Sequence, residues 1–134
     1  MTTTESQIEK KHIFVGQTNG HLMKLDPEKY YIMMRVKLKH HIYCMLQLDN
    51  NSILCGQLHG QLDLVRIRDG EILMSENLKS KMGHIVSMLK TNRPNEVAFA
   101  TKQGIFLANV GRGNMGLKRL EFARMELHES LMSH

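Results

Sequence analysis

Short apolar runs alternate with turn residues along most of the chain, and this pattern predicts β-strands. From residue 42 to residue 75 the sequence contains four runs rich in strand-forming residues, separated by Asp, Asn, Ser and Gly clusters. Because Gly and turn residues interrupt every window of about ten residues, an amphipathic helix fits poorly. We expect strands at 42–48, 53–57, 61–67 and 71–75.

The pattern also repeats along the chain. The segment IFVGQTNG at 13–20 returns as ILCGQLHG at 53–60 and as VAFATKQG at 97–104. The segment HIYCML at 41–46 returns as HIVSML at 84–89, and Ile-Met-Met in the first repeat returns as Ile-Leu-Met forty residues later. Three independent sequence segments that return at offsets of 40 to 44 residues indicate a repeat architecture. This period is typical of β-propeller blades.

Each repeat is expected to supply four short strands joined by tight turns. Asn19-Gly20, His59-Gly60 and Gln103-Gly104 are hairpin signals, because Gly and Asn tolerate positive φ. An open meander or a β-sandwich of short strands is the alternative that this pattern leaves open. In the third repeat we expect strands at 84–90, 96–101, 105–110 and 115–122.

The repeats resemble WD40 repeats over residues 12 to 122. Gly83-His84-Ile85 resembles the Gly-His pair that opens a WD40 blade, and GHLMKLD at 20–26 resembles that family's Gly-Thr-Ile-Lys-Leu-Trp-Asp stretch. The sequence contains no Trp-Asp pair, so the family's buried His–Ser/Thr–Asp–Trp network would have His84 and Thr101 as its members at most. The segment at 20–27 is also similar to the end of quinoprotein-like repeats, which implies no quinone cofactor.

The resemblance implies an all-β fold, namely a β-propeller segment of about three four-stranded antiparallel blades, as an open arc or as part of a larger ring. The blades would span about 12–38, 39–79 and 80–122. A flexible N-terminus is expected at 1–11, and the tail at 123–134 fits either a helix or the start of a further strand. The residues with an implied structural role are Gly20, Gly60, Gly104, His84 and Asp26.

Three blades are fewer than the roughly four to eight that close a propeller. An open arc of three leaves two blade faces unpaired, which is unfavourable for an isolated chain. Three explanations stay open. The chain is a segment of a longer propeller protein, or two copies associate into a ring of about six blades, or the blades cap a partner's propeller or form an open stack of sheets.

Composition narrows the class of protein. Of the 134 residues, 42% are hydrophobic and 23% are charged, which excludes a disordered tail. No apolar run approaches the roughly 18 residues of a membrane-spanning helix, and the first residues lack the pattern of a secretory signal. Two cysteines do not make a disulfide scaffold, so we expect an intracellular protein, with the cytoplasm as the best-fitting compartment.

Motifs for catalysis or metal binding are absent from the sequence. The eight histidines and two cysteines include no zinc-like pair, and the adjacent histidines at 40–41 would point to opposite faces of a strand. If Leu46 pairs with Cys55, then Cys44 and Cys55 share a face but lie too far apart for a disulfide. Nucleophile-elbow, phosphate-loop and dinucleotide motifs are missing, and GRGNMG at 111–116 fits a wide turn. We therefore expect no enzyme activity, no cofactor and no metal.

The charges separate between two rims once blades are assumed. The connections between blades and the turn between the second and third strands share one rim, and the other turns share the opposite rim. The first rim is basic with Glu76 as its one nearby acid, whereas the opposite rim mixes acidic and basic residues. The residues expected to contact a partner are Lys37, Lys39, His40, His59, Lys79, Lys81 and Lys102.

These features together predict a non-catalytic protein–protein interaction scaffold that binds an acidic peptide or domain on its basic rim. A rim that serves only solubility explains the same lysines. Self-association would complete a ring, and no membrane contact is expected. Nucleic acid fits less well, because the rim lacks Arg and stacking aromatic residues. Two other functions stay open: the propeller part of a larger, quinoprotein-like enzyme, and an assembly protein that binds RNA.

Overall fold

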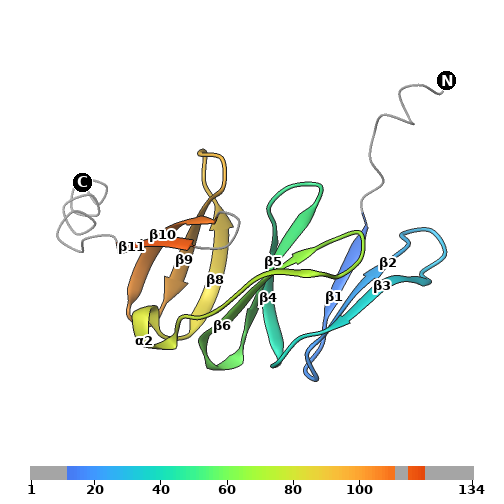
Figure 1. Ribbon diagram of the computed structural model, residues 1–134, viewed down its shortest axis with the longest axis horizontal. Helices are drawn as coiled ribbons and strands as arrows, with labels where there is room; N and C mark the ends of the chain where they lie inside the picture. The colour runs from blue at the N-terminus through green and yellow to red at the C-terminus, as the bar shows by residue number, and fades with distance from the viewer. Residues whose placement is uncertain (1–11, 111–114, 120–134) are drawn as a thin grey trace, which may run out of the picture.

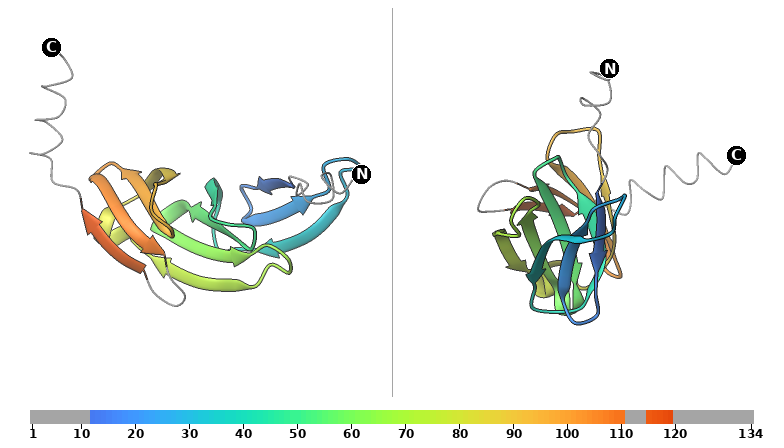
Figure 2. Two further views of the ribbon diagram at one scale, coloured as in Figure 1. Left: turned by 90° about the horizontal axis from the view of Figure 1, so that it is seen from above. Right: turned by 90° about the vertical axis from the view of Figure 1, so that its right-hand side faces the viewer.

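The computed structural model describes residues 12–110 and 115–119, and in these residues the chain forms three antiparallel sheets. Within each sheet the strands are hydrogen-bonded in the order in which they occur in the sequence. Figure 1 shows the sheets side by side, and the left view of Figure 2 shows them along an arc. The first sheet contains β1 (Ile13–Gly16), β2 (His21–Leu25) and β3 (Ile32–Lys37). The second contains β4 (Ile42–Gln47), β5 (Ser52–Gln57), β6 (Gln61–Arg66) and β7 (Ile72–Asn77). The third contains β8 (Ile85–Lys90), β9 (Glu96–Thr101), β10 (Gly104–Val110) and β11 (Met115–Arg119).

The all-β prediction is confirmed, and each expected strand in the second and third sheets has a counterpart. Two short helical segments were not expected: η1 (Leu58–Gly60) in the β5–β6 hairpin, and α2 (Lys79–Met82) between the second and third sheets. The first sheet begins with β1, which corresponds to β5 in the repeat. The counterpart of β4 would fall at residues 2–7, outside the described residues, as do the predictions for 1–11 and 123–134.

Two glycines fix where the chain crosses from one sheet to the next. Gly20 (φ 88°) and Gly60 (φ 74°) adopt left-handed conformations in their hairpins. Each accepts a backbone hydrogen bond from the following connection, with Leu38 N to Gly20 O and Leu78 N to Gly60 O both at 2.7 Å. A Cβ atom at Gly60 would lie 2.6 Å from the backbone nitrogen of Lys79, so the connection packs directly onto the glycine.

The core consists of two apolar layers, each between neighbouring sheets. Leu22 of β2 packs with Ile53 and Val65 of the second sheet, whereas Leu54 of β5 packs with Phe99 of β9 in the third sheet. All six residues of β5 are buried, because the second sheet has neighbours on both faces. This stacking explains why its strands carry apolar residues on both faces.

The two cysteines lie on opposite faces of the second sheet, so the prediction that they share a face is wrong. Met45 rather than Leu46 pairs with Cys55, and an irregularity between Ile42 and Cys44 shifts the β4–β5 register by one residue relative to the Ile42–Gln57 pair. A shift of one residue moves a side chain to the other face of a sheet. Cys44 therefore packs against the layer shared with the third sheet and Cys55 against the layer shared with the first, and both thiols are free.

Candidate interaction site on the basic rim

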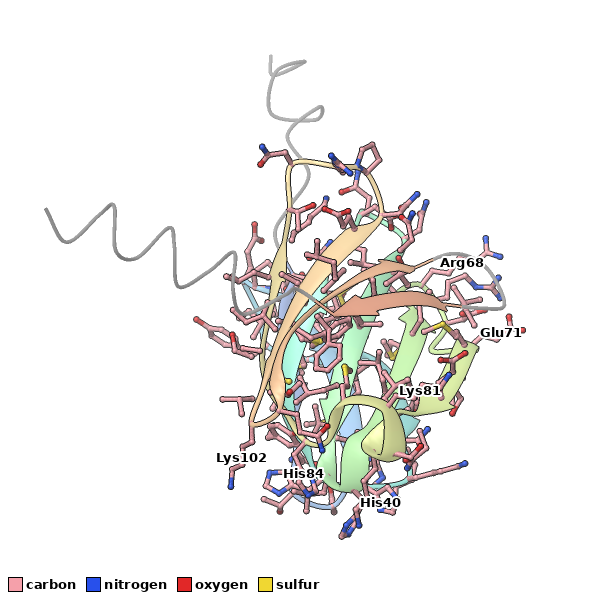
Figure 3. The ribbon with its side chains drawn as sticks, turned by 90° about the vertical axis from the view of Figure 1, so that its left-hand side faces the viewer. His40, Arg68, Glu71, Lys81, His84 and Lys102 are labelled. Carbon is pink, nitrogen blue, oxygen red and sulfur yellow. The ribbon has the colours of Figure 1, made fainter. Side chains whose placement is uncertain are left out.

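The seven residues expected to contact a partner lie in connections at one end of the three sheets. We call this set, which consists of Lys37, Lys39, His40, His59, Lys79, Lys81 and Lys102, the basic rim. Its members come from the end of β3, the β3–β4 connection, the β5–β6 hairpin, α2 and the β9–β10 turn. Figure 3 shows His40 and Lys102 toward one end of the sheets, Arg68 and Glu71 farther toward the other, and Lys81 between them.

Hydrogen bonds hold the backbone at the two histidines of this rim. The backbone nitrogen of His40 donates to Oε1 of the buried Gln57 at 3.1 Å, and Nδ2 of Asn77 donates to the carbonyl oxygen of His59 at 3.0 Å. The imidazole rings of His40 and His59 meet edge to face, with their centroids 5.0 Å apart. The structure thus brings together two residues that are nineteen positions apart in the sequence.

The lysines of the basic rim are exposed and have no carboxylate partner among the described residues. Lys37 makes one internal contact, in which its Nζ donates to the carbonyl oxygen of Asn19 at 2.6 Å. Glu76, the acid expected beside this rim, is half-buried, and its Oε2 atom is buried without a hydrogen-bond partner in the described chain. Among the described residues, no ion pair neutralises the lysines of this rim.

On the opposite rim, by contrast, acidic side chains are engaged in ion pairs and turns. Asp69 accepts a hydrogen bond from Arg66 at 2.8 Å, and Glu71 pairs with the same guanidinium. The hydrogen bond from Arg66 lowers the pKa of Asp69 to about 2, and the same contact raises the pKa of Arg66. Asp26 caps the β2–β3 turn by accepting a hydrogen bond from the backbone nitrogen of Lys29 at 2.8 Å.

The residues with an implied structural role separate into two groups. Gly20, Gly60 and Gly104 adopt positive φ, and Asp26 stabilises its turn, as just described. His84 is exposed, so the expectation that it contributes to a buried WD40-type network is wrong.

The second sheet instead carries a polar cluster around the buried side chains of Gln61 and Asp63, which no sequence motif indicated. Ser75 donates to Oδ1 of Asp63 at 2.6 Å, while Nε2 of Gln61 contacts both Asp63 Oδ1 at 2.9 Å and Ser75 Oγ at 2.7 Å. Asp63 is only 1% exposed. Its signal in the sequence was a carboxylate alternating with leucines within an apolar strand, a position that needs hydrogen-bond donors once it is buried.

The described residues contain neither a cluster suited to metal binding nor a thiol with a lowered pKa. No group of three or more His, Cys, Asp or Glu side chains within them could hold a metal ion. Burial raises the pKa of Cys44 to about 11 and that of Cys55 to about 12, so both thiols stay protonated near neutral pH. None of the helices among the described residues is long and apolar enough to cross a membrane.

Comparisons with known proteins bear on the fold. No family model matches the sequence, and no curated protein matches it. Among solved structures, the chain is similar to the β-propeller domain of Cps50 (Swd1) from Myceliophteria thermophila, with a TM-score of 0.69 and 12% identity over 82% of this chain and 34% of that one. The chain folds as blades of a β-propeller.

A second similar structure is that of a designed protein. The blades are similar to the computationally designed Ika8 protein, with a TM-score of 0.60 and 12% identity over 85% of this chain and 32% of that one. The chain thus spans about a third of the length of both structures. In chain order we call the three sheets the first, second and third blades, and the basic rim draws residues from all of them and from the connections between them.

Proposed function

We propose that this protein is a non-catalytic interaction scaffold whose basic rim binds an acidic peptide or protein domain. The observation that carries the proposal is the concentration of exposed lysines on one rim, whereas the opposite rim mixes acidic and basic side chains. Lysines from the three blades and their connections emerge on one rim without a carboxylate partner in the described chain, whereas Asp69, Glu71 and Glu96 on the opposite rim are ion-paired.

Electrostatics favour an acidic partner for such a rim. Like charges held close together repel one another, and an approaching acidic segment relieves this repulsion while its association is accelerated by steering. Single exposed ion pairs contribute only about 0–1 kcal/mol, so affinity requires several lysines at once. A rim that gathers lysines from successive blades meets this requirement.

A protein partner fits the rim better than a nucleic acid does. Non-specific binding of single strands relies on exposed aromatic rings on which bases stack. The most exposed aromatic residues of the described chain, Tyr30 (66%) and Tyr31 (55%), lie in the β2–β3 turn on the opposite rim. The absence of catalysis and an intracellular location complete the proposal, and the two free thiols agree with a reducing compartment.

Charge reversal on the two rims tests the proposal. The test variant carries Lys37→Glu, Lys39→Glu, Lys79→Glu and Lys81→Glu, and the control carries Lys29→Glu and Arg68→Glu on the opposite rim. Fluorescence anisotropy with a labelled oligo-glutamate peptide should show binding that weakens with salt and falls at least about tenfold in the test variant only. Equal binding by the wild type and the test variant would remove the proposal, as would preferential binding of a labelled single-stranded RNA.

A further inference from the structure

Among the described residues, no blade covers the outer face of the first blade at positions where the second blade is buried. In the second blade, Ile53 (2% exposed) and Val65 (0%) face the first blade, which covers them. Their counterparts forty residues earlier are Ile13, which is 38% exposed, and Leu25, which is half-buried. The pairing is the same in both blades, Ile53 with Val65 and Ile13 with Leu25, so the two faces are equivalent.

On the third blade, the opposite side of the sheet is exposed at positions where the second blade is packed against a neighbour. In the second blade, Leu46 and Leu54 pair with each other and pack against the third blade. The corresponding pair in the third blade is Leu89 with Ala98, and no blade of the described chain covers it. Leu89 is 67% exposed, the highest value among the large apolar side chains of the described residues.

Apolar residues of the outermost strands are exposed whether or not a neighbouring blade is present. Ile32 (48%) and Met33 (40%) of β3 are about as exposed as their counterparts Ile72 (43%) and Leu73 (37%) of β7. The second blade has neighbours on both sides, so these residues are exposed because they belong to outermost strands. Ile13 differs, because its counterpart Ile53 is buried. β1 is also the edge strand of its sheet among the described residues, whereas β5 lies between β4 and β6, so the exposure of Ile13 reflects both this edge position and the lack of a described blade over it.

We propose that a second copy of this chain covers both faces, with the third blade of each copy packed against the first blade of the other. The two uncovered faces are opposite sides of a blade. Inside the chain, the same two kinds of face meet at both interfaces, where the first blade packs on the second and the second packs on the third. A face that meets a different face makes a head-to-tail contact, which closes a ring when the rotation permits. Two copies supply six blades, within the usual range of about four to eight.

This inference rests on the fold and does not depend on the acidic partner. Head-to-tail packing keeps every blade in the same orientation, so both copies would present their basic rims on one side of the ring. The ring is tested by molar mass and the acidic partner by salt-dependent peptide binding. Failure of one therefore leaves the other standing.

Molar mass in solution tests the proposal. Light scattering coupled to size-exclusion chromatography of the full chain at about 100 μM, well above a micromolar dissociation constant, should give twice the 15.5 kDa chain mass. A chain that stays monomeric at this concentration would overturn the proposal. Masses that grow beyond two copies with concentration would overturn the closed ring.

Two substitutions, one on each face, establish the head-to-tail geometry. Ile13→Asp and Leu89→Asp should each raise the dissociation constant of the dimer at least about tenfold, because each buries a carboxylate in an apolar contact. Ile72→Asp is the matched control, since Ile72 is 43% exposed and lies on neither face. An equimolar mixture of the two variants should regain dimer, because one of its two contacts then carries no substitution.

The pattern across variants separates this geometry from others. If only one of the two substitutions weakens the dimer, like faces are paired and the proposal is wrong. Because all three substituted side chains are exposed in the single chain, each variant should keep the circular dichroism spectrum of the wild type. A monomeric Leu89→Asp variant with that spectrum therefore reports loss of the contact and not loss of folding.

Discussion

Replacing Gly60 with alanine should strongly destabilise the protein, because two separate costs coincide at this residue. The first is conformational: at φ 74° an alanine adopts the left-handed region at a cost of about 1–2 kcal/mol. The second is steric, because the new Cβ would lie 2.6 Å from N and 2.7 Å from Cα of Lys79. These are backbone atoms at the start of α2, so the helix itself has to move.

The steric cost can be estimated from insertions into packed structures, which lose about 1–3 kcal/mol when the backbone must shift. The total for Gly60→Ala is then about 2–5 kcal/mol, a large part of the roughly 5–15 kcal/mol by which a domain is stable. Displacement of α2 also moves Lys79 and Lys81, so binding of an acidic peptide should weaken in the variant even where it stays folded.

Gly70→Ala is the matched control. Gly70 has a similar φ of 80°, but the nearest atoms to its Cβ position are side-chain atoms, Val36 Cβ at 3.1 Å and Met34 Sδ at 3.2 Å. The Met34 thioether can move and Val36 has to give by only a few tenths of an ångström, so the control should lose little beyond the conformational cost of about 1–2 kcal/mol. The measurement is urea unfolding followed by far-ultraviolet circular dichroism, since the chain has no tryptophan for fluorescence. Losses for the two variants that agree within about 0.5 kcal/mol would refute the steric argument.

Two further predictions concern titratable groups. Because burial raises the pKa of Cys44 to about 11 and of Cys55 to about 12, both thiols should react slowly with an aromatic disulfide reagent at pH 7 and quickly in urea, and a fast reaction of the native protein would contradict their burial. The pKa of Asp69 falls from 3.8 to about 2 on folding, so its contribution to stability is present above about pH 4 and is lost as the pH falls toward 2. Asp69→Asn should therefore lower the urea midpoint at pH 7 and lower it progressively less below pH 4, whereas a difference that is constant across this range would show that the carboxylate charge is not responsible.

The fold was largely predictable from local signals. Strand positions follow from short apolar runs, and turns follow from glycines such as Gly20 and Gly60 that adopt conformations other residues disfavour. The repeat predicts the blade architecture, which no single short segment does, because segments forty residues apart have the same structural role. The split into a basic and a mixed rim also followed from the order of strands and turns. Binding by the basic rim stays a prediction.

The errors arose where a side chain's role depends on contacts between distant segments. A one-residue register shift in β4 placed Cys44 and Cys55 on opposite faces, and the pattern of apolar residues does not report such a shift when both faces are buried. His84 matched a family motif, yet its side chain is exposed. Asp63, which matched no motif, became the centre of a buried hydrogen-bonded cluster.

The sequence by itself determined the repeat, the strands, the turns and the rim on which each charge lies, because these depend on local backbone preference and on strand order. The tertiary structure decided the register within the second blade, the pairing of His40 with His59, and which blade faces are covered. Those features depend on side chains far apart in the sequence packing against one another. Ile13 and Ile53 illustrate the point: they occupy the same place in their repeats, but only Ile53 has a blade packed against it.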